Sequence, residues 1–165
     1  MIEKVLKTQR RSRNGIAFFS IMARSEGCKR LRKIKATRDS RAIDSEPLIQ
    51  AVIRFVSVYA IRGGYGVITV PPASSEGVSW AGDIAERISE ATGIPYEVFF
   101  RPHGMGKRCY LGAKFRPITF SWAIEPERKR VLVFDDFSMT NITITETIRE
   151  IRSKGMDCEG LVICV

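Results

Sequence analysis

Two adjacent carboxylates are followed by a cluster of hydroxyl and amide side chains in the last third of the sequence. Asp135 and Asp136 come directly after the apolar run 131–134, and the polar residues that follow are Ser138, Thr140, Asn141 and Thr143. Adjacent carboxylates can bind sugar hydroxyls or a hydrated Mg²⁺. Hydroxyls and backbone N–H groups at the start of a helix can bind a phosphate, which the helix dipole favours. The pattern predicts a site for a ribose 5-phosphate group, with Asp135 and Asp136 also as metal ligands.

A second group of small residues, Ala73, Ser74 and Ser75, follows the apolar run 66–70 and two prolines. In an open parallel sheet, ligands bind beyond the carboxyl ends of the strands. Both groups of residues are predicted to lie at such ends. Ala73, Ser74 and Ser75 are therefore candidate substrate-binding residues as well.

Other protein classes also carry acidic pairs at strand ends, and two of them conflict with the sequence. A nucleotide-hydrolysing P-loop protein would need a G-x-x-x-x-G-K-[ST] loop, which the sequence lacks. A receiver domain carries its acidic pair near its N-terminus, whereas only 29 residues follow Asp136. A third alternative stays open, in which the two aspartates only cap a loop through local hydrogen bonds.

Apolar residues alternate between helical and strand-like spacing from residue 45 onward. Ser45, Glu46 and Pro47 form a helix start, and Gly63 with Gly64 ends that helix. We expect helices at about 45–61, 78–92 and 142–154, and strands at 66–70, 96–100, 118–122, 131–134 and 161–165. This order predicts an α/β domain over residues 45–165, with a mostly parallel central sheet and helices on both faces.

The positive charge is concentrated in the first 44 residues, which we treat as a separate basic segment. Residues 1–41 hold 13 Lys or Arg and three acids, whereas the other 124 residues hold 14 basic and 15 acidic side chains. Such a segment attracts polyanions, either nucleic acid through residues 4–41 or phosphorylated small molecules. A basic surface that only keeps the protein in solution is an equal alternative. The apolar run 15–22 within the segment has the length of a strand.

The cysteines and the apolar runs exclude several classes of protein. Of the four cysteines none forms a C-x-x-C pair, and His103 is the single histidine, so a zinc site has little support. We expect four free thiols rather than disulfides. No apolar run has the length of a membrane span, and the N-terminus lacks the apolar region of a secretory signal. These features predict a cytoplasmic protein without a membrane partner, and a homodimer is the commonest assembly for such domains.

The segment Val131–Ile144, with the sequence VLVFDDFSMTNITI, resembles the phosphoribosyl pyrophosphate (PRPP) signature of type I phosphoribosyltransferases. That signature places four apolar residues and two acids before a loop rich in threonine and glycine. Among subfamilies, the predicted competence-type amidophosphoribosyltransferases look closest, although their N-terminal zinc module is absent here. The resemblance covers residues 66–165 and implies a type I phosphoribosyltransferase-like fold.

By this resemblance, Asp135 and Asp136 hold the ribose hydroxyls, and the residues around Thr140 and Thr143 bind the 5′-phosphate. Residues 70–74 match the pyrophosphate-binding loop, and the basic stretch 101–117 matches the flexible catalytic loop. Within that stretch, the candidate catalytic residues are Lys107 and Arg108. The implied activity is that of a glycosyltransferase, which transfers the phosphoribosyl group of PRPP to a nitrogen nucleophile. Its cofactor would be Mg²⁺, and pyrophosphate would be released.

Two positions of the phosphate loop differ from the family pattern, because Asn141 and Ile142 stand where the family has glycines. Asn adopts a left-handed backbone at modest cost, whereas β-branched Ile does not do so easily. This difference favours an alternative function, a non-catalytic protein that senses PRPP or a nucleotide, or binds nucleic acid. In a further alternative, residues 1–44 form the hood that covers the acceptor in this family, and their charge attracts phosphorylated substrates.

Overall fold

The computed structural model describes residues 6–22, 26–37, 41–72, 79–101, 118, 120–124, 127, 129–137 and 141–164. Within these ranges, no helix combines the length and the apolar character that crossing a membrane requires. The description below concerns these residues.

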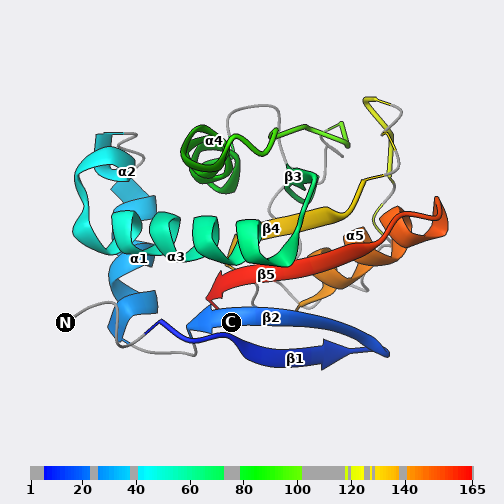
Figure 1. Ribbon diagram of the computed structural model, residues 1–165. Coiled ribbons are helices and arrows are strands. Elements are labelled where there is room, and N and C mark those ends of the chain that lie inside the picture. The colour runs from blue at the N-terminus through cyan, green and yellow to red at the C-terminus, as the bar shows by residue number, and fades with distance from the viewer. Residues whose placement is uncertain are drawn as a thin grey trace.

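The fold is α/β, with a five-stranded and mostly parallel sheet (Figure 1). The strands are β1 (Gln9–Arg13), β2 (Ile16–Met22), β3 (Val67–Thr69), β4 (Val131–Phe137) and β5 (Cys158–Cys164). Their order in the sheet is β1-β2-β5-β4-β3, and β1 alone among them is antiparallel to its neighbour. The expected parallel α/β sheet is thereby confirmed.

Helices cover both faces of the sheet. The helices are α1 (Glu26–Thr37), α2 (Arg41–Ser45), α3 (Pro47–Gly63), α4 (Trp80–Thr92) and α5 (Ile142–Ser153). One apolar core lies between the sheet and the helices α1, α3 and α4, and a second lies between the sheet and α5. The second core is so tight at Gly160 on β5 that an added Cβ would lie 2.7 Å from Ile148 Cδ1.

Local sequence signals place α3 and α4 close to their predicted positions. The α3 helix begins at Pro47. Its N-terminal cap is Glu46 rather than the expected Ser45, and the Glu46 side chain accepts a hydrogen bond from the Leu48 N–H. Gly64 ends α3 in a left-handed conformation, and Gly93 ends α4 in the same way. In α5 the expected inward residues Ile144, Ile148 and Ile151 are all buried.

Three sequence predictions need correction. Where strands were expected at 96–100 and 118–122, the described residues form isolated bridges, of Tyr96 with Ile68 and of Phe100 with Trp122. The strand expected at 131–134 continues through Asp135 and Asp136 to Phe137, which was expected to begin the loop. Within the basic segment, β2 pairs with β5, so this strand belongs to the same sheet as the strands of the predicted α/β domain.

The prediction of four free thiols is wrong for two of the cysteines. Cys28 on α1 and Cys164 at the end of β5 form a disulfide, with 5.8 Å between their Cα atoms. Cys158 is free and buried, as expected. The sequence could not indicate the pairing, because the two cysteines are 136 positions apart. Disulfides persist mainly in oxidising surroundings, so the expected cytoplasmic location stays an untested prediction.

Candidate functional site

The chain changes direction across the sheet between β3 and β4. From β3 it passes through α4 to the segment around Tyr96, which pairs with the outer side of β3. It then returns to β4 on the other side of β3, and α5 leads on to β5. In open α/β sheets, ligands bind beyond the carboxyl ends of the strands at such a switch point. The carboxyl ends of β3 and β4 are therefore the candidate site, which we call the switch-point site.

Asp135 and Asp136 stand at this end of β4, beyond the last residue that pairs with β3. That last pair is Thr69 with Val133. Side chains alternate along a strand, which directs Asp135 to the α5 face and Asp136 to the face of α1 and α4. Each carboxylate also accepts a hydrogen bond from the next backbone N–H: Asp136 N to Asp135 Oδ1 at 2.9 Å, and Phe137 N to Asp136 Oδ1 at 2.7 Å.

The carboxyl of Asp135 is in an unfavourable place for a negative charge. Burial raises its pKa well above the ordinary value, the neighbouring carboxylate of Asp136 raises the pKa further, and Lys35 lowers it only in part. A carboxyl perturbed in this way at a strand end is typical of functional sites, where a ligand or cation supplies the missing partner. The alternative of two aspartates that only cap a loop fits poorly, because both belong to the strand.

Two buried side-chain oxygens, at the end of β3 and at the start of α5, lack hydrogen-bond partners among the described residues. Thr69 Oγ1, at the end of β3, and Asn141 Oδ1, at the start of α5, are buried and form no hydrogen bond with any residue that the structure describes. Buried polar atoms without partners are rare, and each one needs an explanation, such as a bound ligand, ion or water. By register, Thr69 shares the α5 face with Asp135.

The start of α5 has no side-chain cap among the described residues. Asn141 caps the helix in a left-handed conformation, with φ 59°, and its side chain makes no capping hydrogen bond. Thr143, a candidate phosphate ligand, lies in the first turn and is half-buried. The N–H groups of this first turn therefore keep the geometry that binds phosphate at helix N-termini. Asn141 has the left-handed backbone that asparagine adopts at modest cost, and Ile142 occupies an ordinary helical position instead of a strained one.

A cluster of aromatic and basic side chains lies on the other face, beside Asp136. The rings of Trp80 on α4 and Phe137 on β4 are stacked, with centroids 6.3 Å apart and planes at 19°. Lys35 on α1 forms an ion pair with Asp136, and its Nζ lies 5.8 Å from the Trp80 centroid and 5.4 Å from that of Phe137. Arg32 lies over Phe137, with its Cζ 5.6 Å from the centroid. These contacts suit a planar or anionic group.

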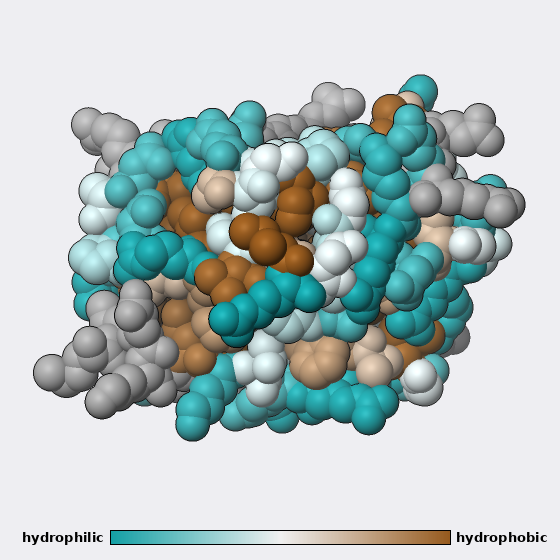
Figure 2. All heavy atoms as spheres, in the orientation of Figure 1, coloured by the Kyte–Doolittle hydropathy of each residue, from teal (hydrophilic) through white to brown (hydrophobic). Residues whose placement is uncertain are grey.

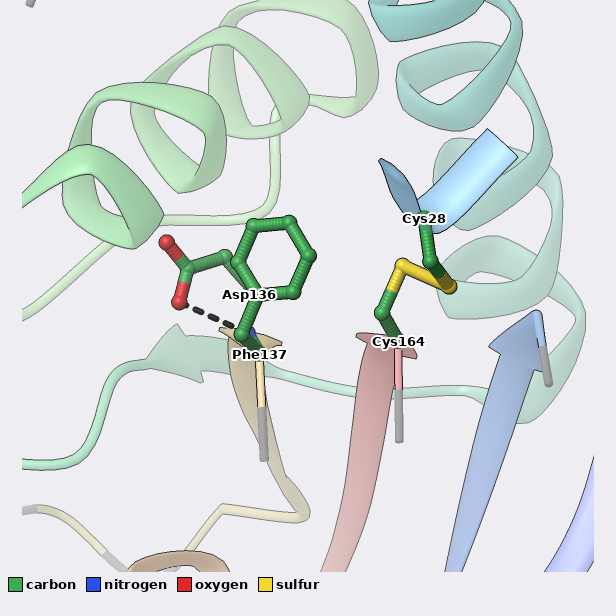
Figure 3. The surroundings of a disulfide bond; sticks show 4 residues. All are labelled: Cys28, Asp136, Phe137 and Cys164. Carbon is green, nitrogen blue, oxygen red and sulfur yellow. Dashed lines mark hydrogen bonds between the residues drawn. A yellow bond between two sulfur atoms is a disulfide. The ribbon is translucent and has the colours of Figure 1, made fainter. Parts of the chain in front are cut away.

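The disulfide fixes α1 over the switch-point site. It joins α1 to the end of β5, the strand next to β4, and Figure 3 shows the bond beside Asp136 and Phe137. Phe137 and Cys164 are paired in the register of these two strands. The covalent bond and the ion pair of Lys35 therefore anchor the same helix to the carboxyl ends of two neighbouring strands.

The structure describes four of the predicted site residues: Asp135 and Asp136 on β4, and Asn141 and Thr143 at the start of α5. The others lie outside the described residues, namely Ala73, Ser74, Ser75, Lys107, Arg108, Ser138 and Thr140. Sequence reasoning missed Lys35 and Arg32, because it gave the basic segment no position. Arg32 and Lys35 are three residues apart, which places them on the same side of a helix. This spacing does not indicate which part of the protein that side of the helix contacts.

Asp135 and Asp136 fit a Mg²⁺ ion only if a phosphorylated ligand supplies the other ligands of the ion. Asp135 and Asp136 start toward opposite faces, and among the described residues no group of three His, Cys, Asp or Glu side chains is placed to hold an ion. Magnesium commonly binds through one or two carboxylates together with substrate phosphates. A magnesium ion carried by a phosphorylated ligand and touched by one carboxylate agrees with this arrangement.

Comparison of the chain with protein-family models found no match, and comparison with curated proteins found none either. The functional argument therefore depends on the geometry of the switch-point site and on the motif in β4 and α5.

Proposed function

We propose that the switch-point site binds PRPP or another ligand with a ribose 5-phosphate group. The observation that carries this proposal is a group of polar features on one face: Asp135 with its raised pKa, the unpartnered Thr69 Oγ1, and the start of α5, where Asn141 makes no side-chain capping hydrogen bond. A phosphate at the helix start and sugar hydroxyls at Asp135 would satisfy all of these groups together.

The parts of the ligand have distinct places in this proposal. The 5′-phosphate accepts hydrogen bonds from the first N–H groups of α5, near Asn141 and Thr143. Ribose hydroxyls donate to Asp135, and Mg²⁺ carried by the diphosphate meets Asp135 or Asp136. The Trp80 and Phe137 rings, with Arg32 and Lys35, then face the diphosphate or an acceptor base. In this arrangement α1 has the position of a hood over the acceptor.

As an enzyme, the protein would be a phosphoribosyltransferase of the type I fold. The bond from C1 of the ribose to pyrophosphate breaks, a bond from C1 to a nitrogen nucleophile forms, and the nucleophile loses a proton. Such a transition state has oxocarbenium character, so positioning and neutralisation of charge supply most of the catalysis. Lys107 and Arg108, together with the backbone of Ala73, Ser74 and Ser75, are the residues proposed to bind the leaving pyrophosphate.

A second candidate is a protein that binds the same ligand without transferring its phosphoribosyl group. The observation in favour is the ion pair between Lys35 and Asp136, because this carboxylate is already neutralised by a residue of the chain itself. Lys35 and Arg32 contact the switch-point site, which favours phosphorylated ligands over nucleic acid as the partners of this part of the basic segment.

Calorimetric titration with PRPP, with and without Mg²⁺, tests the binding proposal on wild-type protein and on Asp135→Asn. We expect Mg²⁺-dependent binding that Asp135→Asn weakens by about tenfold or more, because a bond to a charged group is lost. Lys129→Met is the matched control, since it removes an exposed lysine whose ion pair with Glu127 lies outside the site. Pyrophosphate release in a screen of amines and nucleobases then separates a transferase from a binding protein. Absence of binding to folded wild-type protein would contradict both candidates.

A further inference from the structure

A cavity lies on the outer side of α3, at the opposite end of the sheet from the switch-point site. It has a volume of about 520 Å³, within the range of sites for small molecules. One stripe of α3 forms its wall, through Arg54, Phe55, Val58, Tyr59 and Arg62. The floor comes from residues near the amino ends of β4 and β5, where Leu132 pairs with Glu159. We call this cavity the α3 pocket.

The floor of the α3 pocket is a fixed polar network. The hydroxyls of Tyr59 and Tyr65 both donate to Glu159 Oε1, the latter at 2.5 Å. The two rings are stacked, with centroids 6.1 Å apart and planes at 18°. Arg130 lies over Tyr65 at 4.7 Å and has its Nη2 3.8 Å from Glu159 Oε2. Burial and the bond to Glu159 raise the pKa of both phenols, so the hydroxyls stay protonated as donors.

The wall of the α3 pocket includes accessible apolar side chains. The side of α3 that faces the sheet is buried, yet apolar residues continue onto its outer side. Val58 is 48% exposed and lines the pocket, together with Phe55 and Ala51. Figure 2 shows apolar side chains gathered in the middle of this face, within a rim of more polar residues. A folded chain exposes such a group of apolar side chains mainly where it binds something.

The charges around the α3 pocket favour an anion. Three guanidinium groups line it, those of Arg54, Arg62 and Arg130, against the single carboxylate of Glu159. Arg130 is engaged with Asp157 and Glu159. Arg62 makes no ion pair with any residue that the structure describes, and it lies one turn of α3 from Val58. A cation beside an apolar wall is the arrangement that binds an amphipathic anion.

We propose that the α3 pocket binds a small organic anion with an aromatic body, such as an aryl carboxylate or sulfonate. The flat body packs on Phe55, Val58 and the Tyr59 ring, and the anionic group meets Arg62 at the rim. This site does not depend on the switch-point site and has no part in phosphoribosyl transfer.

Fluorescence titration with 8-anilinonaphthalene-1-sulfonate tests the proposal, since this probe is an aromatic anion. Val58→Glu should weaken binding about tenfold or more, because it places a carboxylate in the apolar wall. Ile61→Glu is the matched control, because Ile61 is 59% exposed on the same helix but does not line the pocket. The affinity of this variant for the probe should stay within about twofold of wild type. Both sites are exposed, and circular dichroism checks that both variants fold.

The neutral probe N-phenyl-1-naphthylamine tests the anion preference. Arg62→Gln should weaken binding of the sulfonate probe about threefold and leave binding of the neutral probe unchanged. Equal binding of the sulfonate to wild type and Val58→Glu would overturn the proposal. Sedimentation that shows a dimer, dissociated by both Val58→Glu and Ile61→Glu, would also overturn it and assign this face to a second copy of the chain. PRPP binding should be the same in all three variants, which separates failure here from failure of the switch-point proposal.

Discussion

Lys35 and Asp136 form an ion pair that joins the basic N-terminal segment to the end of β4, across 101 positions of sequence. The side chain of Asp136 is 6% exposed, whereas that of Lys35 is 42% exposed. The carboxylate is thus held inside the protein by a lysine that itself reaches water. This contact places the positive charge of α1 at the switch-point site.

Lys35→Met should lower the free energy of unfolding by about 1–2 kcal/mol, because it leaves the buried Asp136 carboxylate without its cation. The loss is smaller than for a fully buried pair, since water reaches Lys35. The double variant Lys35→Met/Asp136→Asn should recover about 1 kcal/mol of it. Urea unfolding measures both values. Lys129→Met, in an exposed pair with Glu127, should cost less than about 0.5 kcal/mol. Equal losses of unfolding free energy in Lys35→Met and Lys129→Met would show that the ion pair of Lys35 with Asp136 stabilises the protein no more than an exposed pair does.

Asp135→Asn should make the protein more stable at neutral pH. Burial and Asp136 raise the pKa of Asp135 in the folded protein above 3.8, its ordinary value. The folded state therefore binds the proton more tightly, and this contribution to stability is lost as the pH rises through the raised pKa. Urea unfolding from about pH 4 to about pH 8, without divalent ions, should show a decline for wild type that Asp135→Asn lacks. Asp157→Asn, which removes an exposed carboxylate, should leave that decline in place.

Asn141→Ala should destabilise the protein by about 1–2 kcal/mol, because alanine pays a steric penalty in the left-handed conformation at φ 59°. Asn141→Gly should stay within about 0.5 kcal/mol of wild type, since glycine adopts this conformation freely. Thermal unfolding of the two variants gives the comparison. Asn14→Ala, at φ 49° in the turn between β1 and β2, is a positive control for the same backbone effect. A glycine variant as unstable as the alanine variant would mean that the side chain matters more than the backbone.

The double variant Cys28→Ser/Cys164→Ser should be less stable by about 3–5 kcal/mol, because the disulfide closes a long loop in the unfolded chain. Peptide mapping without reductant should recover Cys28 and Cys164 in one linked peptide. The buried Cys158, whose pKa burial raises to about 12, should resist alkylation in the folded protein. Addition of reductant should lower the stability of wild type and leave the double variant unchanged. Sensitivity of the double variant to reductant would contradict the assigned pairing.

The periodic part of the sequence was the predictable part. Ile144, Ile148 and Ile151 mark one face of α5 by spacing alone, and Gly93 marks the end of α4 through its freedom to adopt positive φ. The β1–β2 hairpin also has a local signal in the sequence: Asn14-Gly15, a pair typical of two-residue hairpin turns.

The contacts that complete the switch-point site were beyond such reasoning. Lys35 meets Asp136, and Cys28 meets Cys164, only because the sheet order places β2 beside β5 and β5 beside β4. That order depends on long-range strand pairing, about which local spacing carries no information. The strand expected at 96–100 was wrong for a related reason, because a strand needs a partner along its length and Tyr96 pairs at one position only.

The measurement that tests the central claim most directly is nuclear magnetic resonance mapping of PRPP binding, in the presence of Mg²⁺, on isotope-labelled protein. The claim predicts that amide signals shift at Asp135, Asp136, Asn141 and Thr143, with weaker shifts on α1 around Lys35. Signals of the α3 pocket around Val58 should stay in place and act as the internal control. Shifts confined to α3, or no shifts at ligand concentrations that saturate a phosphoribosyl site, would contradict the account.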